Sequence, residues 1–166
     1  PRLWKSLEPA AIAAVKHPGK KYTITNTSWW VYKNFLWFEL PSGRRLAYYG
    51  PEVRFKATPW GEKRETLYHW ESNSVTKQWE CNGNYGGKLT ENVVQGIARD
   101  FMAAAMLRIE AAGYEIVLSV HDELLAERKI GEGNLNEFEN LMSAKENWGF
   151  GCPISVDGWV NDRYKK

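Results

Sequence analysis

Three titratable residues stand side by side between two apolar segments: His121, Asp122 and Glu123. They follow Glu115–Val120 (EIVLSV), a run with strand character, and apolar character returns in Leu124–Ala126 (LLA). This pattern predicts a β-hairpin with the acidic residues at its tip. A carboxylate held at the end of two strands is rigid yet open to solvent, which suits a hard divalent cation. Mg²⁺ is the expected ion, because it prefers oxygen ligands and typically takes only one or two of them from the protein.

Two other interpretations of this tripeptide stay open. An ordinary polar turn would also place acidic residues between two strands. A His–Asp metallohydrolase would need several further His ligands. The chain has only His17, His69 and His121, and the first two lie in a helix stop and in a Trp-rich strand region, which disfavours such an enzyme.

A second group of polar residues has helical spacing. Asn92, Gln95 and Arg99 stand at i, i+3 and i+7, so a helix places all three on one flank. Two amides and a guanidinium aligned in this way can lie in a nucleic-acid groove. Amides suit the minor groove, where the base pairs offer similar acceptors and contact does not discriminate sequence. A solvated helix face is the other interpretation.

The element that must carry this flank is the longest in the chain. Leu89–Gly113 (LTENVVQGIARDFMAAAMLRIEAAG) predicts a helix on the order of 35 Å long, with Thr90 as N-cap and Gly113 as the stop. The residues expected on its apolar face are Val94, Ile97, Ala98, Phe101, Ala105, Ile109 and Ala112.

The region before this helix is built differently. An apolar pattern from Leu3 to Val15 predicts a helix that ends at His17-Pro18-Gly19. Short aromatic and β-branched runs then extend to Trp79, separated by turn signals such as Pro59-Trp60-Gly61, and predict a meander of antiparallel strands. Asn82–Gly87 (NGNYGG) is expected to be a flexible joint.

The composition indicates what kind of protein this is. The 166 residues amount to 19.1 kDa and include 43% hydrophobic and 14% aromatic residues, with nine Trp, enough for one domain with its own core. So many aromatic residues lead us to expect an exposed aromatic surface that meets a partner.

The charge is only +2, so a nucleic-acid surface must come from local placement of charge. Cys81 and Cys152 are expected to be free thiols. The chain has no signal peptide and no membrane-spanning run, so we expect a cytoplasmic protein without a membrane partner.

The helix and the hairpin together resemble a known family. Gln95–Asp100 (QGIARD) followed by Val120–Glu123 (VHDE) is similar, in order and separation, to the C-terminal palm of family A DNA polymerases, the polymerase I type. The similarity covers residues 85–166. The stretches YGGKLTENVVQGIARD, LPSGRRLAYYGP and DRYKK look most like bacteriophage members.

The resemblance implies roles at the hairpin. Asp122 matches one of the two aspartates that bind the catalytic Mg²⁺ ions, and Glu123 matches a supporting acidic residue beside them. His121 matches a residue close to the primer terminus. The implied substrates are a DNA primer–template and deoxynucleoside triphosphates, with phosphoryl transfer achieved by positioning and charge neutralisation.

The resemblance also implies nucleic-acid contacts along the helix. Gln95 and Asn92 match residues that hold the minor-groove side of the primer–template. Lys88 and Arg99 are included in this nucleic-acid-binding set, although Arg99 matches no catalytic residue of the family. The family usually has one more residue between the helix Asn and Gln than separates Asn92 and Gln95 here. Asp100 is expected to make a structural contact.

Two family motifs do not occur in the 166 residues. One is the strand D-Y-S-x-I-E with the second metal-binding aspartate, and the other is the fingers helix R-x-x-x-K-x-x-x-F-G that grips the triphosphate. Both precede the matching region in the family, so an N-terminal polypeptide or segment is the expected partner. Pro1 suits a natural start after removal of Met, as in a split polymerase or a truncated gene, and suits an imposed boundary equally well.

The expected architecture is α+β: an antiparallel palm sheet with the catalytic hairpin, backed by long helices and preceded by a β-rich aromatic insertion. Residues 1–19 would be a helix at the end of the fingers, 20–84 the insertion and 85–166 the palm. In the palm, a capping pattern at Asn134–Glu137 predicts a helix, Pro153–Val156 predicts an edge strand, and Arg163–Lys166 forms a basic tail. The expected function is the palm part of a template-directed DNA polymerase. The alternative is a non-catalytic nucleic-acid-binding or assembly module that keeps the palm fold.

Overall fold

The structure is a computed structural model that describes residues 2–57 and 61–164. Pro59 and Trp60 of the predicted turn, and Lys165 and Lys166 of the basic tail, lie outside the described residues. The chain forms two compact units, one ending at Ile97 and the other beginning at Ala98. The mixed α and β composition with antiparallel sheets is compatible with the predicted α+β class.

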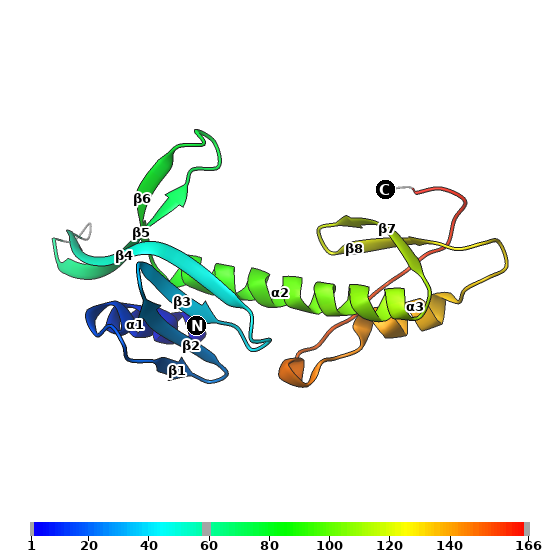
Figure 1. Cartoon of the computed structure of the whole chain (residues 1–166), viewed down its shortest axis with the longest axis horizontal. Coiled ribbons are helices and arrows are strands. Elements are labelled where there is room, and N and C mark those ends of the chain that lie inside the picture. The colour runs from blue at the N-terminus through cyan, green and yellow to red at the C-terminus, as the bar shows by residue number, and fades with distance from the viewer. Residues whose placement is uncertain (1, 58–60, 165–166) are drawn as a thin grey trace. The chain divides into compact units, whose positions relative to one another are not determined.

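The first unit is a helix followed by an antiparallel meander, as the sequence predicts (Figure 1). Helix α1 spans Arg2–Lys16 and packs against the sheet, whose strands follow one another in chain order. The strands are β1 (Tyr22–Ile24), β2 (Thr27–Tyr32), β3 (Phe35–Glu39), β4 (Arg45–Ala57), β5 (Lys63–Ser72) and β6 (Trp79–Asn84).

Alternation along the strands separates the two faces of this sheet. Leu36 and Phe38 of β3 are fully buried, and their register partners Val31, Trp29 and Tyr48 lie on the same face. This face packs on α1 to form the core of the unit. The buried members of that core are Leu7, Ala11, Ala14, Trp29, Leu36, Phe38, Leu40, Tyr48, Leu67, Leu89 and Val93.

The predicted flexible joint at Asn82–Gly87 is wrong. Asn82, Gly83 and Asn84 belong to β6 and pair with His69, Tyr68 and Leu67 of β5, and α2 begins two residues later. The Asn84 side chain is fully buried, which a mobile joint would not allow.

The run Ser74–Glu80 (SVTKQWE) has strand character in the sequence, but β6 begins only at Trp79. The side chain of Asn73 accepts the backbone N–H groups of Val75 and Thr76 at 2.9 and 3.1 Å, so this segment is a turn. The ladder with β5 therefore begins only at Trp79.

Helix α2 spans Gly86–Ala111 and takes part in both units. It begins four residues before the predicted N-cap, and the hydroxyl of Thr90 donates to the carbonyl of Gly86 at 2.7 Å from inside the helix. Gly113 has φ +83° two residues after the last residue of the helix, Ala111, which confirms the predicted stop.

The predicted apolar face of α2 is only partly correct. Ala105 and Ile109 are buried as expected, but Val94 is 56% exposed and Val93 is buried in its place. The helix contributes to a separate core in each unit, so a single stripe does not describe its buried side chains.

The second unit contains the predicted hairpin and the predicted helix. Strands β7 (Glu115–Val120) and β8 (Glu123–Glu127) form a two-stranded antiparallel sheet. Helix α3 spans Leu135–Ser143, and the side chain of its N-cap Asn134 accepts the N–H of Glu137, which confirms the capping pattern. A short 3₁₀ helix, η1, spans Asn147–Gly149.

The core of the second unit lies between α2, the hairpin and α3. Its buried members Ala105, Ile109 and Tyr114 contact Ile116, Leu124, Ala126, Phe138, Leu141 and Met142. The predicted edge strand at Pro153–Val156 is wrong, because this segment is irregular and joins no ladder with β7 or β8. Among the described residues, none of the helices combines the length and apolar character needed to cross a bilayer.

Candidate functional site

The hairpin tip is a two-residue turn made of His121 and Asp122. Val120 and Glu123 are register partners that close the turn, so Glu123 is already the first residue of β8. The hairpin itself is confirmed. A two-residue turn is the tightest common connection between antiparallel strands, and it fixes the position of Asp122 relative to both strands.

The backbone of His121 adopts the left-handed conformation, with φ +53°. Two-residue hairpin turns require positive φ at one or both central positions, and glycine usually supplies it. His is among the few other residues that occupy this region with some frequency. A residue held in an uncommon conformation at an exposed turn motivates a hypothesis of function at this position.

The side chains of His121, Asp122 and Glu123 are all exposed to solvent. Glu123 accepts a hydrogen bond from the hydroxyl of Tyr164 at 2.9 Å, and this bond to a carboxylate raises the pKa of Tyr164. The ring of Tyr164 in turn stacks on Trp159, with centroids 6.2 Å apart. The segment near the C-terminus therefore contacts the hairpin through Glu123, while the Asp122 carboxylate stays exposed.

The donor set fits part of a Mg²⁺ site. Mg²⁺ takes one or two carboxylates from the protein and completes its shell with water and phosphate oxygens. Asp122 offers such a carboxylate on a rigid support, with Glu123 adjacent in sequence. Within residues 2–57 and 61–164, no group of three or more His, Cys, Asp or Glu side chains is arranged to hold a metal ion. Further ligands would have to come from substrate, water or another segment.

The residues predicted on the flank of α2 differ in their surroundings. Gln95 is exposed, and its amide donates to Glu91 one turn earlier at 3.2 Å. Arg99 is also exposed. Asn92 is half-buried and donates to the hydroxyl of Tyr48 at 3.1 Å, so it is tied to the sheet.

Lys88 belongs to a polar network that sequence reasoning missed. Its ammonium lies 2.6 Å from a carboxylate oxygen of Glu71, which also accepts from Asn82 at 3.2 Å. His69 lies beside Glu71, with its Nε2 at 3.3 Å from the carboxylate, and it contacts the Asn84 side chain through Nδ1. Burial lowers the pKa of His69.

No local pattern reveals this network, because its members come from β5, β6 and α2. The aromatic pattern predicts strands in this region, but it does not indicate that β6 runs beside β5 in the register that brings Asn82 opposite His69.

The hairpin brings together His121, Asp122 and Glu123, whereas Lys88, Asn92 and Gln95 lie in the first unit. Asp100 is 8% exposed, in agreement with the structural role predicted for it.

Comparison with known proteins gives one informative relation. The chain is 37% identical over 166 residues to the DNA polymerase of Bacillus phage SP02, and the aligned region covers 99% of this chain. It covers only 25% of that polymerase, so the chain spans a quarter of the relative's length. No protein-family profile and no solved structure matches the chain. The similarity supports the predicted relation to a bacteriophage DNA polymerase.

Proposed function

We propose that this chain is a part of a template-directed DNA polymerase of family A, and that residues 85–166 are its C-terminal palm. The observation that carries the proposal is the exposed Asp122 carboxylate at the tight tip of the β7–β8 hairpin. The similarity of nearly the whole chain to a phage DNA polymerase supports it.

In this proposal, Asp122 is the residue that holds Mg²⁺, and Glu123 supports the site from the first position of β8. When bound, the ion would neutralise the negative charge that develops as a phosphoryl group is transferred. His121 lies next to Asp122 in the turn and positions the primer terminus. Tyr164 holds the Glu123 carboxylate through its hydroxyl and restricts that side chain.

The primer–template contacts come from α2. The guanidinium of Arg99 is exposed, and the exposed amide of Gln95 donates one N–H to Glu91 but keeps a second N–H and its carbonyl oxygen for DNA. Asn92 donates to Tyr48 but keeps its carbonyl oxygen as an acceptor, and Lys88 bonds Glu71 but has further N–H donors. Asn92 therefore contacts DNA through its carbonyl oxygen, and Lys88 contacts DNA through its remaining N–H donors.

The remaining parts of the active site are assigned to another polypeptide or segment. It would carry the second metal-binding aspartate and the fingers helix, neither of which has a matching motif here. Deoxynucleoside triphosphates would bind between that segment and the hairpin.

A chimera tests the proposal. The aligned quarter of the Bacillus phage SP02 polymerase is replaced by this chain, and single-turnover incorporation and primer–template affinity are measured with Mg²⁺. Asp122→Asn keeps the size of the side chain and removes its charge, so incorporation should fall at least ~100-fold, a few kcal/mol of barrier. Primer–template affinity should change far less.

Two further variants of the chimera make the result specific. Gln95→Ala should weaken primer–template binding while leaving the metal dependence intact. Asp157→Asn, at an exposed aspartate outside the hairpin, should leave both quantities unchanged. Incorporation by Asp122→Asn at the unsubstituted rate would refute the metal site and favour the non-catalytic nucleic-acid-binding alternative.

A further inference from the structure

The face of the six-stranded sheet that points away from α1 carries a continuous row of aromatic side chains. The register places Tyr32 beside Phe35, Phe35 beside Tyr49, and Tyr49 beside Trp70, each on a neighbouring strand. We call this surface the aromatic face. Its members are Trp30, Tyr32, Phe35, Trp37, Tyr49, Tyr68, Trp70 and Trp79.

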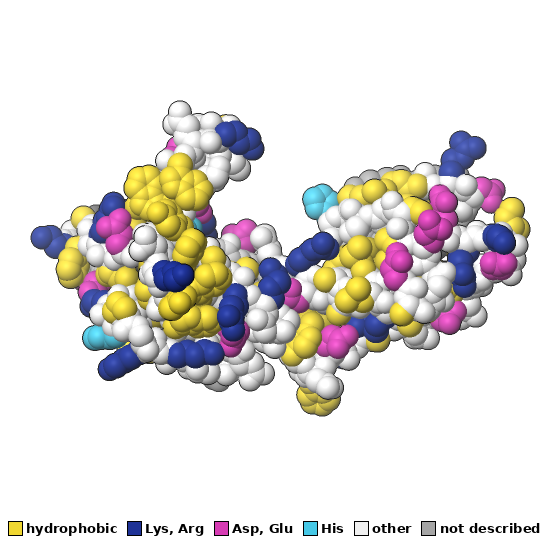
Figure 2. Space-filling view, in the orientation of Figure 1, with side chains coloured by type: hydrophobic (Ala, Val, Ile, Leu, Met, Phe, Trp, Pro, Cys, Tyr) yellow, Lys and Arg dark blue, Asp and Glu magenta, His cyan; other side chains and the backbone are white. Residues whose placement is uncertain are grey.

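Four of these rings, Tyr32, Tyr49, Trp70 and Trp79, are exposed to solvent, and the other four are half-buried between their neighbours. Tyr32 is 60% exposed and Trp79 is 57% exposed, so neither is used to fill the core. The centroids of Phe35 and Tyr49 are 5.3 Å apart, and those of Tyr49 and Trp79 are 6.2 Å apart. Figure 2 shows hydrophobic side chains gathered over this unit, with Lys and Arg side chains among and beside them.

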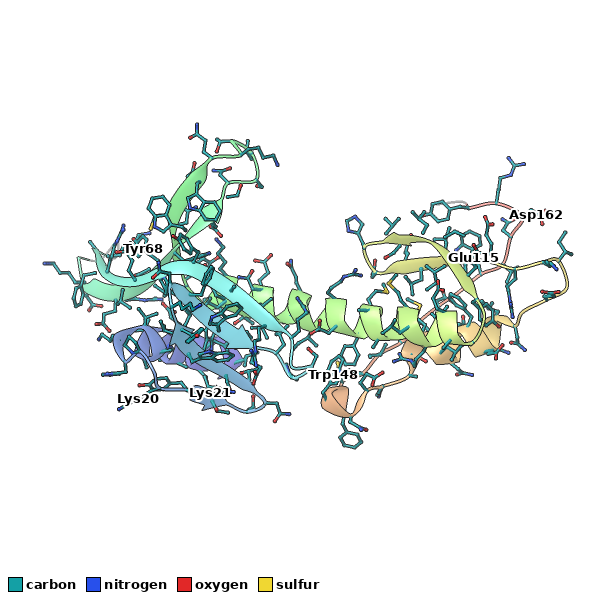
Figure 3. The ribbon with its side chains drawn as sticks, viewed as in Figure 1. Lys20, Lys21, Tyr68, Glu115, Trp148 and Asp162 are labelled. Carbon is teal, nitrogen blue, oxygen red and sulfur yellow. The ribbon has the colours of Figure 1, made fainter. Side chains whose placement is uncertain are left out.

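Cations accompany the rings. Four Lys or Arg side chains of the first unit lie over rings of the aromatic face, with the charged group 4.8 to 5.5 Å from a ring centroid. The pairs are Lys21 and Arg45 over Trp30, Lys33 over Tyr32, and Arg54 over Tyr68. Lys21 and Tyr68 are labelled in Figure 3.

Carboxylates on this face are fewer and already paired. Glu39 is bonded by Lys21 at 2.9 Å and by Arg45 at 3.2 Å, and Glu52 is bonded by Arg54. Lys33 lies over its ring without a carboxylate partner in any described contact. The aromatic face is therefore locally positive, which matches an anionic ligand.

We propose that the aromatic face binds single-stranded nucleic acid, with bases stacked on the exposed rings and phosphates met by the neighbouring cations. Every base has a π-face, so such stacking tolerates any sequence. This inference goes beyond the proposed function and stands without it.

The same observations disfavour a protein partner as the occupant. The centre of a protein–protein interface is depleted of Lys, whereas Lys21 covers Trp30 in the middle of β2 and Lys33 lies over Tyr32. A duplex also fits poorly, because its bases stack on one another and are not free to cover flat exposed rings.

Fluorescence anisotropy of a labelled 15-nucleotide oligothymidine tests the inference on the full chain, without metal or nucleotide. Trp79→Ala and Tyr32→Ala should each weaken binding about tenfold, since stacking on one ring contributes ~1–3 kcal/mol. Trp79→Phe keeps a ring and should bind within about threefold of the unsubstituted chain. Lys33→Ala should weaken binding and make it less dependent on salt.

A matched control is available in the second unit, where Phe150 is 93% exposed and lies outside the aromatic face. Phe150→Ala should leave oligothymidine affinity unchanged. Equal affinity of all variants, or weakening by Phe150→Ala as large as by Trp79→Ala, would overturn the inference. Self-association that Tyr32→Ala abolishes, seen by sedimentation without nucleic acid, would also overturn it, because a second copy would then cover the face. None of these results depends on polymerase activity of the chimera.

Discussion

A buried carboxylate, Glu8, joins the start of α2 to α1 and gives the sharpest stability prediction. It is 8% exposed, and one oxygen accepts the N–H of Gly86, the first residue of α2, at 3.0 Å. The other oxygen accepts from Arg64. Helix N-termini leave N–H groups unpaired and carry partial positive charge, so a carboxylate there stabilises the helix in two ways.

The expected cost of Glu8→Ala follows from these contacts. Loss of a side-chain acceptor at a helix start costs ~1 kcal/mol, and loss of the charge near the dipole costs ~0.3–1 kcal/mol. Arg64 is 54% exposed, so its ion pair adds at most ~1 kcal/mol. We expect a total of about 1.3–3 kcal/mol. Glu8→Gln keeps an acceptor for Gly86 and should lose only about half as much.

Native-state hydrogen exchange is the suitable assay, because the two units need not unfold together. The amides of Leu89 and Val93, both buried in the core of the first unit, should exchange roughly 10- to 150-fold faster in Glu8→Ala. Glu62→Ala, at an exposed position, is the control and should leave exchange unchanged. Acceleration below about threefold in Glu8→Ala would show that Glu8 does not secure α2.

Three other predictions concern the hairpin, the network around His69 and the activity of the chain. His121→Gly should retain the hairpin and raise the free energy of unfolding by up to ~1 kcal/mol, because glycine adopts a positive φ without strain. Asp122→Gly should lower the free energy of unfolding, because φ is not positive at that position. Thermal unfolding of the two variants tests this difference. Burial lowers the pKa of His69, so this side chain binds a proton more readily in the unfolded chain than in the folded one. The free energy of unfolding should therefore be highest above pH ~6.5 and decrease as the pH falls below that value. His69→Gln should flatten this pH dependence, which urea titrations between pH 5 and pH 8 would measure. The 166-residue chain alone should extend no primer with Mg²⁺ and all four deoxynucleotides, and template-dependent extension above the blank would contradict the absence of the two family motifs.

Several parts of the molecule follow from short stretches of sequence. The hairpin was predicted from the apolar runs on either side of His121-Asp122, and the helix beginning at Leu135 was predicted from the capping pattern at Asn134. Gly113 was predicted to end α2. In each case residues within a few positions of one another supply both the hydrogen bonds and the backbone preference, so the local pattern carries the information.

Predictions failed where neighbours distant in the chain decide the outcome. Thr90 was predicted as N-cap, but α2 begins at Gly86, whose N–H is bonded by Glu8, 78 residues earlier. The stretch Asn82–Asn84 was predicted as a joint, but its backbone finds partners in β5. An extended segment becomes a strand only when another strand offers its hydrogen bonds, and no local pattern contains that partner.

The candidate site shows the same division. The sequence alone determined that an acidic tip would follow β7 and that Gln95 and Arg99 would lie on exposed turns of a long helix, because both depend on periodicity and turn chemistry. Only the tertiary structure decided that Asn92 bonds Tyr48 and that Lys88 bonds Glu71. It also decided which aromatic side chains of the meander are buried and which form the exposed aromatic face. Strand alternation gives two faces, but the packing of α1 on one of them selects the face that becomes the core.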